Sequence, residues 1–400
     1  MTEPGTMAAE ATGPTDCRIL VVEDNARNRT LIERFLQAAG FHDIRFATDG
    51  EEGLQRVGDD SPDLVILDIV MPNMDGYAFL ARLREDEGLQ GLPVLVVTGL
   101  ESADERNNVF RAGATDLINK PVNGVEMIAR VNIHLENRLL IRRLEAYRAR
   151  LEEELRLARE MQEGLLPSAK RLREVEHTYP LTLENHFETS SELGGDFWGI
   201  KTLDDQRLGV FITDFSGHGV TAALNTFRLH TLMEQVDQGL DDPASYLTTL
   251  NALLVHLIPR GQFATMFYGI IDTAANRLTY AAAAAPSPMV GTTPDSLEML
   301  DAGGLPLGIS KSATYKNREV DFPAGALLFL YSDALSETPD PEGEMLDEDG
   351  VMEMLKGALD HGHAPLATLI ERFRHRVNDA IPDDLTALLV SRLDGREETD

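Results

Sequence analysis

The stretch Asp68-Ile-Val-Met-Pro-Asn-Met-Asp-Gly76 directly follows the apolar run Leu64–Leu67 and marks the carboxyl end of a buried strand. On either side of it, short apolar runs alternate with amphipathic stretches of helical spacing. The other four runs are Arg18–Val22, Ile44–Ala47, Val94–Val97 and Asp116–Ile118. Strands that alternate with helices in this way predict a parallel, doubly wound α/β sheet. Such a sheet binds its ligands beyond the carboxyl ends of its strands.

Polar residues stand at these strand ends. They are Glu23 and Asp24 after the first strand, Asp68 after the third, Thr98 after the fourth and Lys120 after the fifth. A single aspartate after a strand is usually a helix N-cap, but five polar positions in register indicate a shared site. Clustered carboxylates suit Mg²⁺, which would neutralise an incoming phosphoryl group and let Asp68 attack phosphorus. Thr98 and Lys120 can then bind the phosphoryl oxygens.

With these residues, positions 17–123 resemble the receiver domains of response regulators, which have a flavodoxin-like fold and accept a phosphoryl group from a sensor histidine kinase. The resemblance implies that Asp68 is the phospho-acceptor and that Thr98 and Lys120 sense the phosphoryl group. It also implies an Mg²⁺ site made of Glu23, Asp24, Asp68 and the backbone carbonyl of Val70. The chain departs from the family pattern at Leu117, where receivers usually carry an aromatic switch residue. We therefore expect the effect of phosphorylation to be transmitted out of the receiver domain through the helix that follows it.

That helix is predicted over 124–166, a stretch with almost no turn residues that links two domains. Apolar residues recur there every seven positions, at Leu144, Leu151, Ala158 and Leu165. A second register holds Leu140, Tyr147 and Met161, and Glu154 interrupts it. This spacing is typical of a coiled-coil seam and favours a homodimer through the linker. The alternative is a single amphipathic helix packed on its own domain. Pro167 is expected to end the helix.

After Pro167, strand-like runs and helical segments occur in separate blocks among Gly and Pro turns. This order predicts an α+β domain over 167–394, with antiparallel sheets flanked by helices. The expected strands are 208–213, 265–272, 277–282, 326–331 and 386–391. The expected helices lie near 218–238, 243–258, 350–360 and 365–379. The acidic stretch Glu337–Asp349 is predicted to be a solvated loop.

Aspartates stand at strand ends or tight turns of this domain. They are Asp196 after Gly194-Gly195, Asp214 before Phe215-Ser-Gly, Asp333 after Tyr-Ser, and the neighbours Asp383 and Asp384. Acids brought together from distant parts of a chain suit a two-ion site for in-line displacement at phosphorus. A serine hydrolase is disfavoured, because Ser216 and His218 lie in a glycine-rich turn without a Gly-x-Ser-x-Gly elbow. His218 is expected to structure this turn or to assist proton transfer.

Residues 160–393 resemble the metal-dependent PPM (type 2C) protein serine/threonine phosphatases, specifically their SpoIIE-like bacterial branch. Three further strings carry this resemblance: Ala158–Pro167, Phe263–Tyr268 and Gly303–Gly308. It implies two Mn²⁺ or Mg²⁺ ions held by Asp196, Asp214, the carbonyl of Phe215, Asp333 and Asp383, with Asp384 as the alternative to Asp383. The chain departs from the family at Gly199, at Ala282–Ala285 and at Ala334, but no core metal ligand is lost.

Composition excludes several other classes of protein. The formal net charge of −31 argues against nucleic acid as a partner, because phosphate contacts need clustered Lys and Arg. No stretch is long and apolar enough to cross a bilayer, so no membrane partner is expected. The segment 1–16 lacks the pattern of a signal peptide, and we expect disordered tails at 1–16 and 395–400 on a cytoplasmic protein. Cys17 is the only cysteine, which excludes an internal disulfide and a multi-cysteine metal site.

Together these observations predict a two-component response regulator that is phosphorylated on Asp68. Its output would be metal-dependent dephosphorylation of phosphoserine or phosphothreonine on a protein. By the family resemblance, that protein would be an anti-sigma-factor antagonist. The alternative is a catalytically silent protein that sequesters such a partner according to its phosphorylation state. The four aspartate positions favour the enzyme, because a binding protein has little chemical need for them.

Overall fold

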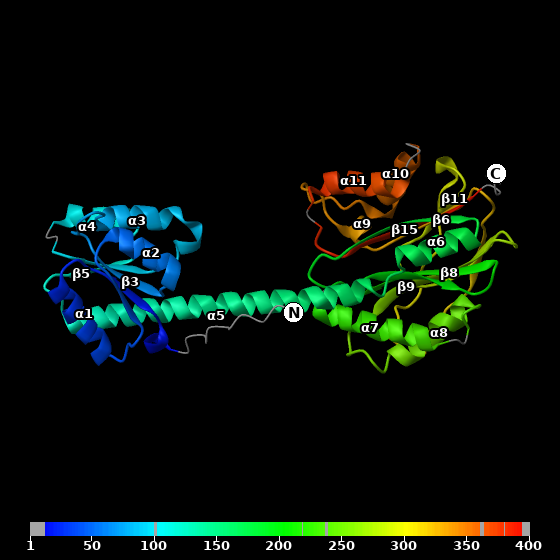
Figure 1. Cartoon of the computed structure of the whole chain (residues 1–400). Coiled ribbons are helices and arrows are strands. Elements are labelled where there is room, and N and C mark those ends of the chain that lie inside the picture. The colour runs from blue at the N-terminus through cyan, green and yellow to red at the C-terminus, as the bar shows by residue number, and fades with distance from the viewer. Residues whose placement is uncertain are drawn as a thin grey trace. The chain divides into compact units, whose positions relative to one another are not determined.

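The computed structural model describes residues 13–99, 102–217, 219–236, 239–360, 364–379 and 381–393. Most of the predicted N-terminal tail, the predicted tail at 395–400 and the side chain of His218 lie outside these residues. The chain divides into two compact units, Met1–Leu151 and Glu152–Asp400. Each unit is described by itself, with the element labels of Figure 1.

The first unit is a five-stranded parallel sheet with the strand order β2-β1-β3-β4-β5. Its strands are β1 (Ile19–Val22), β2 (Ile44–Ala47), β3 (Leu64–Asp68), β4 (Val94–Thr98) and β5 (Asp116–Asn119). Its helices are α1 (Ala26–Ala38), α2 (Gly50–Asp60), α3 (Gly76–Glu85), α4 (Ala103–Arg111) and the first turns of α5 (Gly124–Glu163). Two 3₁₀ turns are also present, η1 (Pro14–Asp16) and η2 (Glu87–Leu89). The doubly wound α/β prediction is confirmed.

Both faces of this sheet are covered, as expected for parallel strands. Residues alternate along β1: Val21 packs with α1 and α5 on one face, and Val22 packs with α3 on the other. Met127, Val131 and Leu135 follow one another at four-residue spacing on α5 and are fully buried on the first of these faces. The first turns of α5 therefore belong to the core of the first unit.

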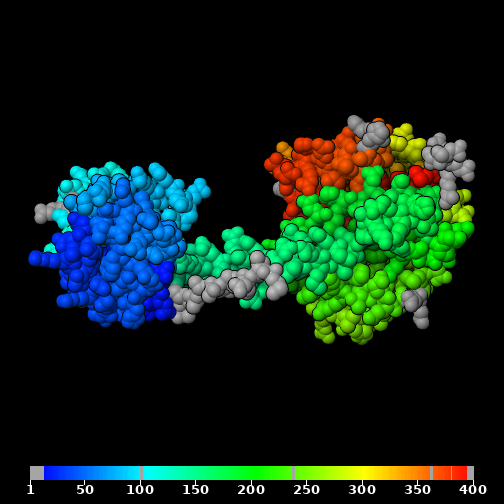
Figure 2. Space-filling model, viewed as in Figure 1, coloured from blue at the N-terminus to red at the C-terminus, as the bar shows by residue number. Residues whose placement is uncertain are grey.

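The α5 helix is 40 residues long and confirms the predicted helical linker. It ends at Glu163, three residues before the predicted end. The amides of Leu165 and Leu166 form tighter i to i−3 hydrogen bonds there, and the Leu166 side chain packs onto the core of the second unit. The apolar side chains of Leu144 and Tyr147 are 68% and 66% exposed, and the middle of α5 lies on the surface in Figure 2. No helix among the described residues is long and apolar enough to span a membrane.

The second unit contains two five-stranded sheets, with the orders β13-β10-β9-β8-β7 and β12-β11-β14-β15-β6. All of its strand pairs are antiparallel. The first sheet consists of β7 (Phe197–Thr202), β8 (Arg207–Phe215), β9 (Ala264–Asp272), β10 (Arg277–Ala283) and β13 (Arg318–Asp321). The second consists of β6 (Leu181–Glu188), β11 (Met289–Gly291), β12 (Glu298–Met299), β14 (Leu327–Tyr331) and β15 (Leu385–Arg392).

Helices cover the outer faces of this sandwich. They are α7 (Val220–Gln235) and α8 (Pro243–Leu254) on the first sheet, and α9 (Ala334–Glu337), α10 (Asp347–Leu359) and α11 (Pro365–Val377) on the second. The helix α6 (Ala169–Thr178) instead packs against the cluster between the sheets, and a 3₁₀ turn η3 (Pro294–Ser296) is also present. One apolar cluster lies between the two sheets, a second joins the first sheet to α7 and α8, and a third joins the second sheet to α10 and α11. This layering of helices, sheet, sheet and helices confirms the predicted α+β architecture (Figure 1).

The prediction of a solvated loop over Glu337–Asp349 is wrong at both of its ends. Glu337 closes α9, and the residues from Asp347 onward open α10. Three acids stand in the first turn of α10, where negative side chains are favourable for a helix. Leu346 is buried in the third cluster and anchors the stretch, whereas residues 341–345 are exposed and outside any helix or strand, so the middle of the stretch is the solvated loop that was predicted.

Candidate functional site

In the first unit, three carboxylates meet at the carboxyl edge of the sheet. Glu23 and Asp24 follow β1, and Asp68 ends β3, which is the neighbouring strand. Oxygens of these three side chains lie within 4.8 Å of one another. Glu23 and Asp68 are buried, whereas Asp24 is exposed. The parallel topology therefore brings together the three acids that the sequence analysis singled out.

Lys120, Thr98 and Val70 complete the predicted set at this edge. The Lys120 ammonium donates a hydrogen bond to Asp68 Oδ2 at 2.6 Å and lies 3.7 Å from Glu23 Oε2. Thr98 is buried at the end of β4, and its carbonyl accepts from the Lys120 amide at 2.8 Å. The Val70 amide points towards Asp68 Oδ1 at 3.4 Å, so its backbone stands beside the same carboxylate. All six predicted positions lie at one site.

The Glu23 carboxylate indicates that this site fits a divalent cation. Burial, together with the nearby charge of Asp68, raises the pKa of Glu23 against the opposing effect of its bonds to Asn25 and Asn28. Its Oε2 atom is buried with no hydrogen-bond donor in the part of the chain that the structure describes. A buried carboxylate oxygen without a partner is costly, and a bound Mg²⁺ would remove that cost.

In the second unit, the predicted aspartates come from both sheets at one end of the sandwich. Asp196 directly precedes β7 and Asp214 lies near the end of β8, whereas Asp333 follows β14 and Asp383 precedes β15. Burial raises the pKa of Asp196 and of Asp214 well above the ordinary range, and neighbouring aspartates add to both shifts. Burial and the charge of Asp383 raise the pKa of Asp333 to about 6. The charge of neighbouring aspartates thus affects each of these three carboxylates, although among the described residues no three acids of this unit bring ligand oxygens within 4.8 Å of one another, unlike the receiver acids.

Glycines allow the backbone to approach these acids closely. A Cβ atom on Gly195 would lie 2.8 Å from the carbonyl oxygen of Phe215, and one on Gly194 would lie 2.6 Å from Asp384 Oδ2. Both distances are too short for any other residue. The Asp196 Oδ2 atom is buried, and no described residue gives it a hydrogen bond. This orphaned oxygen beside further carboxylates fits a bound cation.

The two neighbours Asp383 and Asp384 face different surroundings. Asp384 is buried and accepts hydrogen bonds from the Gly195 amide at 2.5 Å and from the Ser190 amide at 2.7 Å. The Ser190 hydroxyl donates to it as well, at 3.1 Å. Asp383 is only half-buried, and its charge raises the pKa of both Asp333 and Asp214. The carboxylate of Asp384 thus accepts from two backbone amides while its charge raises the pKa of Asp196, whereas the charge of Asp383 acts on Asp333 and Asp214.

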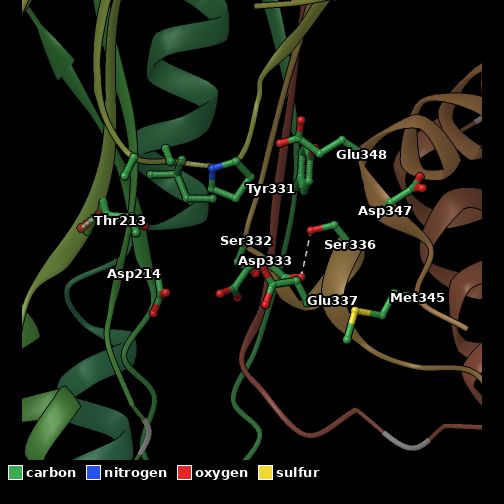
Figure 3. Close-up of a pocket in the computed structure, with 15 residues that line it drawn as sticks. Thr213, Asp214, Tyr331, Ser332, Asp333, Ser336, Glu337, Met345, Asp347 and Glu348 are labelled. Carbon is green, nitrogen blue, oxygen red and sulfur yellow. Dashed lines mark hydrogen bonds between the residues drawn. The ribbon is translucent and has the colours of Figure 1, made fainter. Parts of the chain in front are cut away.

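A pocket of about 680 Å³ opens beside these acids. Asp214 and Asp333 reach it from opposite sheets, and Ser336 donates a hydrogen bond to the carbonyl of Asp333 at 3.1 Å (Figure 3). Its described lining is Ile212, Thr213, Asp214, Thr265, Ala284, Ala285, Pro286, Tyr331, Ser332, Asp333, Ser336, Glu337, Met345, Asp347 and Glu348. Sequence reasoning missed the acids Glu337, Asp347 and Glu348, because only the tertiary fold brings them here.

The departures from the phosphatase pattern have structural explanations. A Cβ atom on Gly199 would lie 2.4 Å from the ring of Phe211, so packing requires glycine there. Ala282 and Ala283 are buried in β10, while Ala284 and Ala285 line the pocket. Ala334 is buried at the start of α9. None of these positions displaces one of the clustered aspartates.

Comparison with known families identifies both units. Residues 19–132 match the family described as "Response regulator receiver domain", and residues 204–393 match "Stage II sporulation protein E (SpoIIE)". The chain therefore combines a receiver domain with a SpoIIE-type PPM phosphatase domain, which is the class that the fold and the two acidic sites define.

Individual relatives match one or the other part. The chain is 28% identical over 231 residues to phosphoserine phosphatase RsbP of Bacillus subtilis. The aligned region covers 56% of this chain and 53% of RsbP. The chain is also 35% identical over 124 residues to response regulator PleD of Caulobacter vibrioides. That region covers 31% of this chain and 27% of PleD. The chain thus spans about half or less of the length of these relatives.

A solved structure supports the fold of the second unit. The SiaA-PP2C domain of Pseudomonas aeruginosa superposes with a TM-score of 0.53 at 20% sequence identity. The match covers 62% of this chain and 98% of that one. The second unit therefore has a PP2C-type fold.

Proposed function

We propose that this chain is a response regulator whose output is metal-dependent hydrolysis of phosphoserine or phosphothreonine on a protein. The observation that carries the proposal is the cluster of Asp196, Asp214, Asp333 and Asp383 beside an open pocket. The raised pKa values of Asp196, Asp214 and Asp333 and the orphaned Asp196 oxygen support a site built for cations. The similarity to a phosphoserine phosphatase supports the choice of substrate group.

In the phosphatase domain, two Mn²⁺ or Mg²⁺ ions would be held by Asp196, Asp214, Asp333, Asp383 and the carbonyl of Phe215. Two such ions, when bound, polarise the phosphoryl group and activate water for in-line attack. We assign the fourth carboxylate to Asp383, because the oxygens of Asp384 already accept from the amides of Gly195 and Ser190. The role of Asp384 would be to hold the loop that carries Asp196.

In the receiver domain, Asp68 would accept a phosphoryl group from a sensor histidine kinase. Mg²⁺ would be held by Glu23, Asp24, Asp68 and the Val70 carbonyl. Lys120 already pairs with the Asp68 carboxylate at 2.6 Å and would pair with the phosphoryl oxygens after transfer. Thr98, at the end of the neighbouring strand β4, would donate its hydroxyl to the same group.

The protein substrate would be a phosphorylated anti-sigma-factor antagonist, and the active form would be a homodimer. Exposed apolar side chains along α5 support the dimer, because Leu140, Leu144, Tyr147, Leu151 and Met161 are each at least 44% exposed. Helices with apolar residues at heptad spacing bury them against a second helix. The net charge of −31 supports a protein substrate rather than nucleic acid.

Turnover of a chromogenic aryl phosphate in the presence of Mn²⁺ tests the phosphatase assignment. The wild-type chain should release phosphate only when the metal is present. The Asp214→Ala variant should lose that activity, because Asp214 is one of the assigned ligands. If neither the aryl phosphate nor a phosphoserine protein is turned over, the enzyme assignment fails. Retention of a phosphoprotein without turnover would instead favour the catalytically silent, sequestering alternative.

A further inference from the structure

The last turns of α5 contact the loop that precedes Asp196. Gln162 is buried there, with only 2% of its surface exposed, although it is a polar residue near a helix end. Its Nε2 atom donates to the Gly194 carbonyl at 2.6 Å, and its Oε1 atom accepts from the Gly194 amide at 3.1 Å. One side chain thus satisfies both backbone groups of a single glycine. This double contact fixes the position and the orientation of the loop.

Arg159 extends the same contact further back along the loop. Its guanidinium donates to the carbonyl of Glu192 at 2.9 Å and to the carbonyl of Ser191 at 3.1 Å. Arg159 and Gln162 are three residues apart and therefore share a face of the helix. Turning α5 by one residue, about 100°, would move both side chains away from the loop.

The loop is held on its other side by the body of the second unit. The Gly195 amide donates to Asp384 Oδ2 at 2.5 Å, and its carbonyl accepts from the Thr226 hydroxyl at 2.9 Å. Gly195 directly precedes Asp196, whose carboxylate belongs to the acidic cluster. The backbone at Gly194 and Gly195 therefore sits between Gln162 and Asp384, and its placement determines where the Asp196 carboxylate points.

We infer that Gln162 is a positioning residue that couples α5 to the metal affinity of the phosphatase site. The inference rests on the proposed function, in which Asp196 is a metal ligand. While Gln162 holds Gly194, the Asp196 carboxylate is directed at the other acids. When α5 shifts or turns, Gly194 loses both hydrogen bonds and the site binds its ions more weakly. Because α5 is unbroken from Gly124 in the first unit, it provides a direct mechanical input to this contact.

Mn²⁺ binding to full-length variants tests this inference. Isothermal titration calorimetry would be carried out on a chain with Asp24→Ala and Asp68→Ala, so that the receiver site does not contribute to binding. In that background, Gln162→Met keeps the volume and the helix but removes both hydrogen bonds. We expect it to weaken Mn²⁺ binding by about 10- to 100-fold, the usual effect of losing a residue that orients a metal ligand. Saturating Mn²⁺ should restore kcat for an aryl phosphate, with KM unchanged.

Two further variants serve as controls. Glu163→Ala changes the next residue of α5, which is exposed, and should leave Mn²⁺ affinity unchanged. Arg159→Ala removes the more exposed part of the contact and should weaken Mn²⁺ binding in the same direction as Gln162→Met. If circular dichroism shows that Gln162→Met does not fold, Arg159→Ala is used in its place.

The outcomes separate this inference from the proposed function. If folded Gln162→Met binds Mn²⁺ as tightly as the wild type, the role of Gln162 is overturned and the phosphatase assignment stays intact. If Gln162→Met does not fold, wild-type affinity in Arg159→Ala has the same consequence. A loss of kcat that saturating Mn²⁺ does not restore would also contradict it, because a positioning effect on metal affinity is reversed by excess metal. No Mn²⁺ binding at all in the chain with Gln162 intact would overturn the phosphatase assignment itself.

Discussion

Asp333 is a carboxylate of the phosphatase site whose pKa is raised towards neutral pH. Burial and the charge of Asp383 raise its pKa from 3.8 to about 6. A folded-state pKa above the unfolded value means that the metal-free folded chain holds a proton that the unfolded chain has released. The carboxylates of this site are therefore a source of instability near neutral pH unless a cation neutralises them.

This titration predicts how stability depends on pH. The contribution of Asp333 to the free energy of unfolding of the metal-free chain should fall by up to about 3 kcal/mol as pH rises from about 3 to 7 through the two pKa values, 3.8 in the unfolded chain and about 6 in the folded one. Mn²⁺ should raise the melting temperature more at pH 7 than at pH 5, because protons compete with the ion for Asp333. Thermal unfolding with and without EDTA measures both effects, and Asp214→Ala is the control. An equal Mn²⁺ effect at both pH values would contradict the assignment of Asp333 as a ligand.

Asp383 and Asp384 show what sequence reasoning could not decide at this scale. Successive residues of an extended segment point to opposite sides, and the register of the strand they precede cannot be known from one sequence. We predict that Asp383→Asn lowers Mn²⁺ affinity about 10-fold or more while the melting temperature of the metal-free chain does not fall. Asp384→Asn should instead destabilise the metal-free fold by about 1 to 3 kcal/mol, because it weakens the acceptor for two backbone amides. Calorimetry and thermal unfolding distinguish the two, and the opposite pattern would make Asp384 the ligand.

Among the helices and strands, those with a clear apolar periodicity of their own were predicted from the sequence, and those without one were not. The five receiver strands were predicted within a residue or so of their ends, because buried apolar runs alternate with helices. In the second unit β6, β7, β11, β12, β13, α6 and α9 were missed. The outward face of β6 carries charged residues, and β7 contains Gly199 and begins directly after a Gly-Gly turn. Both strands are fixed by pairing with β15 and β8 rather than by their own composition.

The same contrast applies to the candidate sites. The meeting of Glu23, Asp24, Asp68 and Lys120 could be predicted, because parallel strands bring their carboxyl ends to one edge. The contact of Gln162 with Gly194 and the acids of α9 and α10 in the pocket could not. They depend on segments 32 or more residues apart that meet only in the folded chain.

The exposed seam of α5 predicts the oligomeric state. Leu144→Glu would place a charge at a position that is 68% exposed in the single chain, so it should not unfold the monomer. In a dimer the same charge would be buried, and we expect the mass in solution to fall from two chains to one. Ala149→Glu changes an exposed residue at the heptad position opposite the seam and should leave the mass unchanged. Sedimentation equilibrium measures both, and a monomeric wild-type chain would contradict the dimer.

At the scale of the whole molecule, two acidic sites of different chemistry are joined by one helix. The first turns of α5 lie in the receiver core at Met127 and Val131, and its last turn holds the loop of Asp196 through Gln162. The usual aromatic switch position is occupied by Leu117, which packs against the cluster on the α3 side of the sheet. We therefore expect phosphorylation at Asp68 to act on the phosphatase through α5.

The most direct test of this account is the rate of phosphate release from a phosphoserine protein by the full-length chain, with and without phosphorylation of Asp68. Release should depend on metal, and its rate should change when a small phosphodonor phosphorylates the wild-type chain. The rate of Asp68→Ala should not respond to the phosphodonor, and Asp214→Ala should release nothing under either condition. Equal rates for the phosphorylated wild type and for Asp68→Ala would contradict the claim that the receiver controls the phosphatase.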